Sequence, residues 1–70
     1  MVEVFKTNVQ HRELAEQLVS VLQGRIDFCK INFDLDDCDK ILRVEGKHIC
    51  VETIIEILNT RGLRCEVLPD

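Results

Sequence analysis

The hydrophobic residues of this chain follow two kinds of spacing, one typical of strands and one typical of helices. Alternation of apolar and polar residues, or a run of β-branched and aromatic residues, indicates a short strand. We identify four such segments: residues 2–7 (VEVFKT), 29–35 (CKINFDL), 41–45 (ILRVE) and 65–67 (CEV). Residues 36–39 (DDCD) predict a turn between the second and third strands, and Pro69 ends the last strand.

Two further segments have the apolar spacing of an amphipathic helix. Between residues 9 and 23 an apolar residue recurs every fourth position, at Leu14, Leu18 and Leu22. A second helix is predicted from residue 51, with one apolar side formed by Val51, Ile54, Ile55 and Leu58.

The residues that flank these helices predict where each helix begins and ends. Asn8 is a good N-cap for the first helix. Gly24 and Gly62 are predicted to end the two helices in the left-handed conformation, where a Cβ atom is penalised. The second helix has no ideal N-cap, and Gly46 is predicted to close the strand before it.

The order of the predicted elements is strand, helix, strand, strand, helix, strand. Two strand–helix–strand halves fit the split βαβ plan, in which both helices cover one face of an antiparallel sheet. Right-handed crossovers place the first and third strands in the centre and the second and fourth at the edges. We therefore predict a single α+β domain over residues 1–70, a four-stranded sheet with two helices on one face.

Size and composition limit the classes of protein to consider. The chain has 70 residues, enough for one small domain, and 46% of them are hydrophobic, with three Phe and no Trp or Tyr. The net charge of −4 argues against binding to nucleic acids or anionic membranes, which favour a basic face. No apolar run approaches the roughly 20 residues of a membrane span, and residues 1–4 lack the pattern of a signal peptide. We therefore expect a cytoplasmic protein.

The four cysteines form no Cys-x-x-Cys pair, and in a cytoplasmic chain we expect reduced thiols. Cys29 and Cys65 occupy apolar positions of the strand patterns and are predicted to act as small core residues. Cys38 and Cys50 are predicted to be the exposed thiols. Cys50 lies near the start of the second helix, where the helix dipole lowers a thiol pKa, but no pattern supplies a catalytic base.

Residues 52–58 (ETIIEIL) and 61–67 (RGLRCEV) carry a resemblance to a known family. They look like the second helix, glycine stop and last strand of heavy-metal-associated domains, the ferredoxin-like modules of copper chaperones and metal-pumping ATPases. The resemblance covers nearly the whole chain and implies a ferredoxin-like βαββαβ sandwich. In that family a Met-x-Cys-x-x-Cys loop between the first strand and first helix binds Cu(I) or Zn(II) through two thiolates.

The resemblance places this metal loop at residues 9–14 (VQHREL), when Leu18 and Leu22 are matched to the family's apolar helix positions. Val9 then stands in place of the Met, His11 in place of the first Cys and Leu14 in place of the second. One imidazole and one leucine cannot replace two thiolates. The resemblance therefore implies the fold without its metal site, and we predict no cofactor.

Other candidate metal ligands are weak. A useful site normally needs three or four ligands, and the isolated candidates are His11, Cys38 and Cys50. The predicted hairpin offers oxygen ligands for a hard cation, at Asp34, Asp36, Asp37 and Asp39. These lack the glycine and distal glutamate of an EF-hand loop. The alternative interpretation is a solvated hairpin whose charges protect an edge strand from aggregation.

Proteins of the same topology suggest two activities that these residues do not favour. Acylphosphatases hold a phosphate in the first strand–helix loop, but residues 7–11 (TNVQH) contain no glycine, and Arg12 lies just inside the helix. RNA-recognition domains stack bases on the central strands, where this acidic chain offers Phe5 and Arg43. We therefore predict neither enzymatic activity nor RNA binding.

Three hypotheses for function remain. The first is a binding or interaction module, a degenerate heavy-metal-associated-like domain that pairs with a second copy or another protein. The contact would be an edge strand or an apolar patch with Phe5 or Ile41 on the uncovered sheet face. The alternative is a Cu/Zn carrier or redox protein that uses cysteines outside the motif, with Cys38 and Cys50 the freest. The third is a sensor that binds a small molecule in a sheet or dimer groove.

Overall fold

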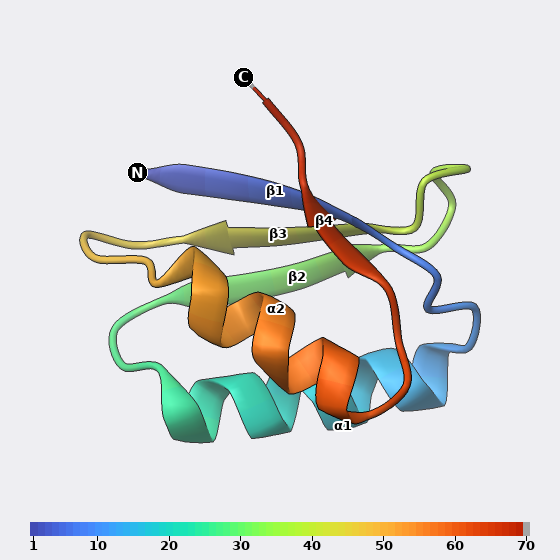
Figure 1. The fold of residues 1–70 in the computed structure, drawn as a ribbon, viewed down its shortest axis with the longest axis horizontal. Helices are drawn as coiled ribbons and strands as arrows, with labels where there is room; N and C mark the ends of the chain where they lie inside the picture. The colour runs from blue at the N-terminus through green and yellow to red at the C-terminus, as the bar shows by residue number, and fades with distance from the viewer. Residues whose placement is uncertain (70) are drawn as a thin grey trace.

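The computed structural model describes residues 1–69 as four strands and two helices (Figure 1). Their bounds are β1 Val2–Thr7, α1 Arg12–Arg25, β2 Lys30–Asp34, β3 Ile41–Glu45, α2 Val51–Thr60 and β4 Cys65–Val67. The predicted α+β fold and its βαββαβ order are confirmed. Within this part of the chain, neither helix combines the length and the apolar character that crossing a bilayer requires.

The strands form one antiparallel sheet in the order β2-β3-β1-β4. β1 pairs with β3 so that Phe5 lies opposite Leu42, and β3 pairs with β2 so that Val44 lies opposite Ile31. β4 pairs with the other side of β1. The prediction that the first and third strands are central and the second and fourth are edges is confirmed.

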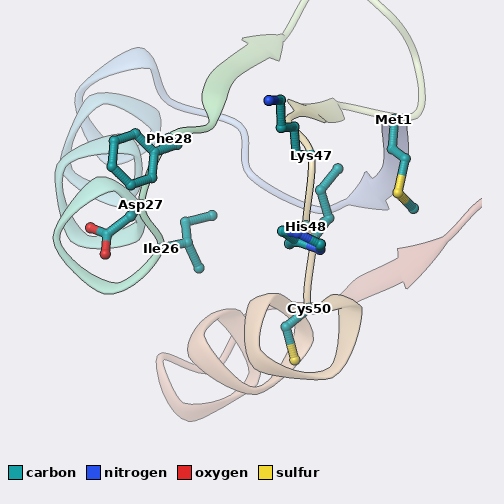
Figure 2. A pocket seen from close by; sticks show the side chains of 8 residues that line it. Met1, Ile26, Asp27, Phe28, Lys47, His48 and Cys50 are labelled. Atoms are coloured by element: carbon teal, nitrogen blue, oxygen red, sulfur yellow. The ribbon is translucent and has the colours of Figure 1, made fainter.

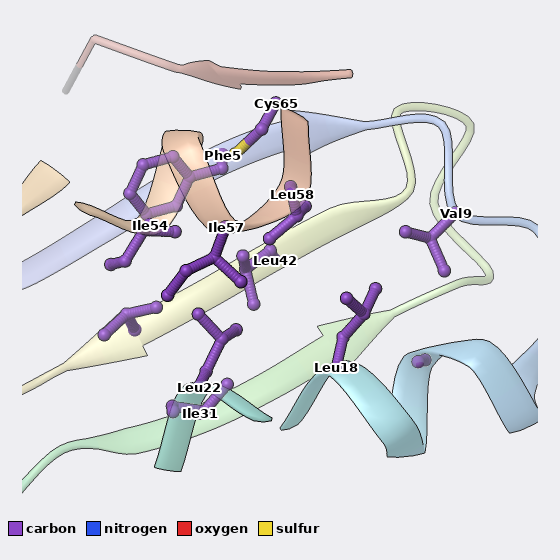
Figure 3. Close-up of a cluster of buried hydrophobic side chains, with 12 residues drawn as sticks. Phe5, Val9, Leu18, Leu22, Ile31, Leu42, Ile54, Ile57, Leu58 and Cys65 are labelled. Atoms are coloured by element: carbon purple, nitrogen blue, oxygen red, sulfur yellow. The ribbon is translucent and has the colours of Figure 1, made fainter. Parts of the chain in front are cut away.

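Both helices cover the same face of the sheet, and the core lies between the two layers (Figures 1 and 3). The helices bury their apolar stripes, which consist of Ala15, Leu18 and Leu22 on α1 and Ile54, Ile57 and Leu58 on α2. The sheet contributes Phe5, Ile31, Leu42, Val44 and Cys65. Each fully buried large aliphatic side chain stabilises the fold by about 1.5–3 kcal/mol, so this aliphatic core is the main source of stability.

The prediction that Phe5, Ile41 or both lie on the uncovered face of the sheet is confirmed for Ile41 and wrong for Phe5. Phe5 is 0% exposed, because it shares a face with its opposite residue Leu42 and both point toward the helices. Ile41 does lie on the uncovered face, half-buried, directly opposite Lys6 on one side and Asp34 on the other. Phe5 is therefore not available for an apolar contact patch or for stacking on a base.

α1 begins at Arg12, three residues later than predicted. Val9 belongs to the preceding loop and is fully buried, with its N–H donating to Thr7 Oγ1 at 3.2 Å. Asn8 does not cap the helix, because its Oδ1 accepts the Arg64 N–H at 2.9 Å. The N-cap is His11, whose side chain makes no capping hydrogen bond. A contact with a residue far along the chain has thus replaced the expected local cap.

The two predicted helix-ending glycines have different outcomes. The prediction for Gly24 is wrong, since α1 continues through it to Arg25. The left-handed residue after α1 is instead Phe28, with φ 59°. The prediction for Gly62 is confirmed, since its φ is 78° and the chain turns there at the end of α2.

Candidate functional site

The two ends of the sheet carry the candidate sites. One end, which we call the hairpin end, combines the β1–α1 loop (8–11), the β2–β3 hairpin (35–40) and the α2–β4 loop (61–64). Thr7 joins the first two of these segments. Its N–H donates to the Asp39 carbonyl at 3.1 Å, and its hydroxyl donates to the Lys40 carbonyl at 2.5 Å. With the Asn8–Arg64 bond, the loop that the resemblance points to is fixed from both sides.

The residues at the position of the family's metal loop do not fit a soft-metal site. Val9 is fully buried and Leu14 is half-buried, and neither side chain has a donor atom. His11 is exposed at the N-terminus of α1 and supplies one imidazole. Cu(I) and Zn(II) carriers need sulfur donors, and none of the four cysteines lies in this loop.

The hairpin end also brings together three of the predicted weak ligands. One donor atom each of Asp37, Cys38 and Asp39 lie within 4.8 Å of one another. The carboxylates already have partners, since Asp37 Oδ1 accepts the Asp39 N–H at 2.8 Å and Asp39 Oδ1 lies 3.6 Å from Lys6 Nζ. These bonds account for the cluster as a charged turn. Cys38 is exposed, as predicted.

The opposite end of the sheet holds a groove of about 870 Å³ (Figure 2). We call it the end groove. It lies where the end of α1, the start of the chain and the β3–α2 loop meet. Its lining, mostly apolar in surface, consists of Met1, Ile26, Asp27, Phe28, Lys47, His48, Ile49 and Cys50. A volume of this size is in the range of pockets that bury a small ligand or an inserted side chain.

Phe28 is the most unusual residue of the end groove. The residue is 99% exposed, and its φ of 59° lies in the left-handed region, which costs a non-glycine residue about 1–2 kcal/mol. Met1, which is 72% exposed, adds a second apolar side chain. The two side chains lie on opposite sides of the groove, with Lys47 and His48 between them (Figure 2).

The sequence contained a signal for Phe28 that the strand prediction did not use. Ile31 and Phe33 alternate with polar residues along β2, and Phe28 falls on the polar phase of that alternation. An aromatic residue out of phase with the strand that follows it cannot join the same buried face. The β3–α2 loop, which forms the other wall of the groove, had no such signal. Its approach to the end of α1 depends on contacts between segments that are distant along the chain.

Cys50 places a thiol on the wall of the end groove, at the N-cap of α2. It is exposed, as predicted. The Thr53 hydroxyl donates to Cys50 Sγ at 3.0 Å, and this hydrogen bond, together with the Thr53 backbone, lowers the pKa of the thiol from its ordinary value of 9.0. A threonine hydroxyl does not take up the thiol proton at neutral pH, so the pair lacks the base of a catalytic nucleophile.

The two remaining thiols lie at opposite edges of the sheet. Cys65 on β4 is buried, as predicted, and burial raises its pKa to about 11. Cys29, just before β2, is half-buried, with its thiol 3.9 Å from the His48 carbonyl. β2 and β4 are three interstrand spacings apart, each about 4.8 Å. One metal ion therefore cannot bind both sulfurs.

No family model, curated protein or solved structure matches this chain. The likeness to heavy-metal-associated domains therefore stays a prediction from the sequence. The geometry of the two ends of the sheet is the basis for a functional conclusion. At the hairpin end the carboxylates of Asp37 and Asp39 already have partners, whereas the end groove presents exposed apolar side chains.

Proposed function

We propose that this chain is a non-enzymatic, cytoplasmic interaction module that binds an apolar side chain of a partner protein in the end groove. The fully exposed Phe28 carries the proposal. Burial of a phenylalanine side chain stabilises a contact by about 1.5–3 kcal/mol. A partner that covers Phe28 would gain this energy without a change in the fold.

The chemistry of the end groove favours a protein segment as the ligand. Its wall includes Ile26 and Ile49, both half-buried, and its charged residues Asp27 and Lys47 are of opposite sign. A peptide that inserts one apolar side chain and keeps its polar backbone at the rim matches this composition.

We further propose that the chain is a degenerate relative of heavy-metal-associated domains, with their fold and without metal transfer. The strand order and the two helices on one face support the first part. The buried Val9 and the donor-free Leu14 at the ligand positions support the second. Four free cysteines are compatible with the reducing conditions of the cytoplasm.

The proposed function is tested by selecting a displayed random peptide library on the folded domain and measuring the affinity of the selected peptides by calorimetry. We expect the selected peptides to share a large apolar residue and Phe28→Ser to weaken their binding about tenfold or more. Val67→Ser is the matched control, since Val67 is 43% exposed and lies on β4, outside the groove. Failure to select apolar peptides, or equal binding by the Phe28→Ser variant, would reject the proposal.

Among residues 1–69, the alternative function, a Cu/Zn carrier that uses cysteines outside the motif, is favoured only by Cys38 between two carboxylates. Titration of the reduced domain with Cu(I) or Zn(II) against a chelator of known affinity tests it. We expect no tight stoichiometric binding, because the two carboxylates already have partners within the protein. Stoichiometric binding that Cys38→Ser abolishes would favour the carrier instead.

A further inference from the structure

The edge strand β2 directs unpaired backbone groups away from the sheet. Gly46, which follows β3, donates its N–H at 3.0 Å to a carbonyl just before β1. Alternate residues of a strand direct their backbone groups to opposite sides, so Arg43 faces β2, and its opposite residue Asn32 faces β3. Ile31 and Phe33, on either side of Asn32, therefore direct their N–H and C=O groups outward, where another strand can pair with them.

The sequence of β2 is complementary to itself in the antiparallel direction. The strand reads Lys-Ile-Asn-Phe-Asp from Lys30 to Asp34. If a second copy runs antiparallel with the two Asn32 residues opposite each other, Lys30 of each copy lies opposite Asp34 of the other. Both charged side chains are exposed. Opposite charges at directly opposed positions contribute about 0.2–1 kcal/mol per pair, and the symmetry produces two such pairs.

The same register also allows the backbone groups of the two strands to pair and places their apolar side chains opposite each other. Ile31 of one copy lies opposite Phe33 of the other, and these are the residues whose N–H and C=O groups point outward. Each such pair can exchange two hydrogen bonds, as in any antiparallel ladder. Phe33 is only half-buried and borders a small groove of about 270 Å³ with Ala15 and Val19 of α1. Pairing would cover this remaining apolar surface.

The other edge and the neighbouring registers are less suitable. β4 is three residues long, and Pro69, which has no N–H, follows it closely. On β2, moving the twofold axis by one residue to Ile31 places Lys30 opposite Asn32. Moving it to Phe33 places Asn32 opposite Asp34. Within the strand, only the axis at Asn32 pairs every charge with its opposite.

We propose that two copies of this chain form a homodimer in which their β2 strands pair antiparallel about a twofold axis at Asn32. The two sheets then become one continuous sheet. This interface is separate from the end groove, so it goes beyond the proposed function and does not depend on it. Since it rests on one short strand from each copy, we expect the dimer to dissociate on dilution.

Charge reversal tests the register. Sedimentation velocity from about 10 µM to about 1 mM should show a concentration-dependent dimer for the natural chain. Lys30→Asp or Asp34→Lys turns both attractive pairs into repulsive ones and should weaken dimerisation about tenfold or more. The double variant restores opposite charges and should restore the dimer. Phe28→Ser should dimerise normally, which separates this inference from the function of the groove.

Glu56→Lys is the matched control for Asp34→Lys, because it makes the same change of charge at an exposed position of α2. It should leave dimerisation unchanged. A natural chain that stays monomeric over the whole range, or a double variant that does not recover, would overturn the proposal. Equal weakening by Glu56→Lys would also overturn it, since the effect would then come from net charge.

A disulfide tests the axis independently. Residues opposite each other without mutual hydrogen bonds have Cα atoms about 4.5 Å apart, within the range that a disulfide spans. Asn32→Cys, with Cys38 and Cys50 changed to serine, should form a covalent dimer when oxidised with diamide. Lys30→Cys in the same background should not, because its opposite residue is Asp34. A covalent dimer from Lys30→Cys alone would contradict the register.

Discussion

At the scale of single residues, the space around Gly46 shows how a missing side chain shapes the end groove. A Cβ atom on Gly46 would lie 2.7 Å from Cys29 Sγ and 3.3 Å from the Phe28 carbonyl oxygen. Both distances are shorter than an ordinary van der Waals contact. Glycine at residue 46 therefore allows the chain before β2 to approach the end of β3 without displacing Cys29 or the carbonyl of Phe28.

We predict that Gly46→Ala lowers the free energy of unfolding by about 1 kcal/mol, because either Cys29 or the backbone must move. In a Cys29→Ala background the closest contact is absent, and most of this loss should disappear. The contact with the Phe28 carbonyl oxygen is longer and needs only a small adjustment. Urea denaturation of the natural chain, the two single variants and the double variant measures the coupling. If the losses of unfolding free energy from the two substitutions were simply additive, a contact between residue 46 and Cys29 would be contradicted.

At the scale of elements, the ends of the helices depend on bonds that the local sequence only partly indicates. Gly62 ends α2 as its position predicts, since a residue there needs positive φ. Asn8 has the right residue type for an N-cap, yet it bonds to Arg64, 56 residues away along the chain. The apolar stripes of both helices were predictable because their spacing is local, whereas the partner of Asn8 was not.

The N-terminus of α2 provides a prediction about reactivity. Thr53→Val removes the hydroxyl that donates to Cys50 Sγ, so the pKa of Cys50 should rise. Alkylation of Cys50 by iodoacetamide, followed by mass spectrometry across pH, should then shift to higher pH. The rates for the two proteins should converge at high pH, where both thiols are ionised. Cys38, exposed on the hairpin, is the internal reference and should keep its profile.

At the scale of the whole molecule, a small aliphatic core holds the sheet and the helices together. Because Cys65 is buried in this core, the stability of the folded protein depends on pH. Cys65 on β4 packs in this core, where burial raises the pKa of its thiol to about 11. The folded state thus favours the protonated thiol more than the unfolded state does. The contribution of the protonated Cys65 thiol to the free energy of unfolding is complete below the ordinary pKa of 9.0 and is lost as the pH rises through about 11.

We predict that the urea midpoint of the natural chain falls between about pH 9 and pH 11 and that Cys65→Val falls less over this range. Valine cannot ionise, so this variant lacks the cost of burying a thiolate. Cys38→Ala is the control, since Cys38 is exposed and its removal should leave the slope unchanged. Parallel pH profiles for the natural chain and Cys65→Val would show that the buried thiol does not control the alkaline transition.

The sequence by itself determined the fold class, the order of elements, the central and edge strands, and the exposure of Cys38 and Cys50. These follow from periodicity and chirality, which act over a few residues or one crossover. It did not determine the face occupied by Phe5, because β1 carries apolar residues in both phases, at Val4 as well as at Phe5. Only pairing with β3 decided that Phe5 points toward the helices.

The end groove and the outward face of β2 were likewise decided by the tertiary structure. The groove joins the start of the chain to Phe28 and Cys50, and no local pattern relates these three segments. The order Lys-Ile-Asn-Phe-Asp is present in the sequence, but its significance depends on β2 being an edge with Ile31 and Phe33 directed outward. Periodicity indicates what an element can bury, whereas contacts between distant residues decide which surfaces remain free to bind.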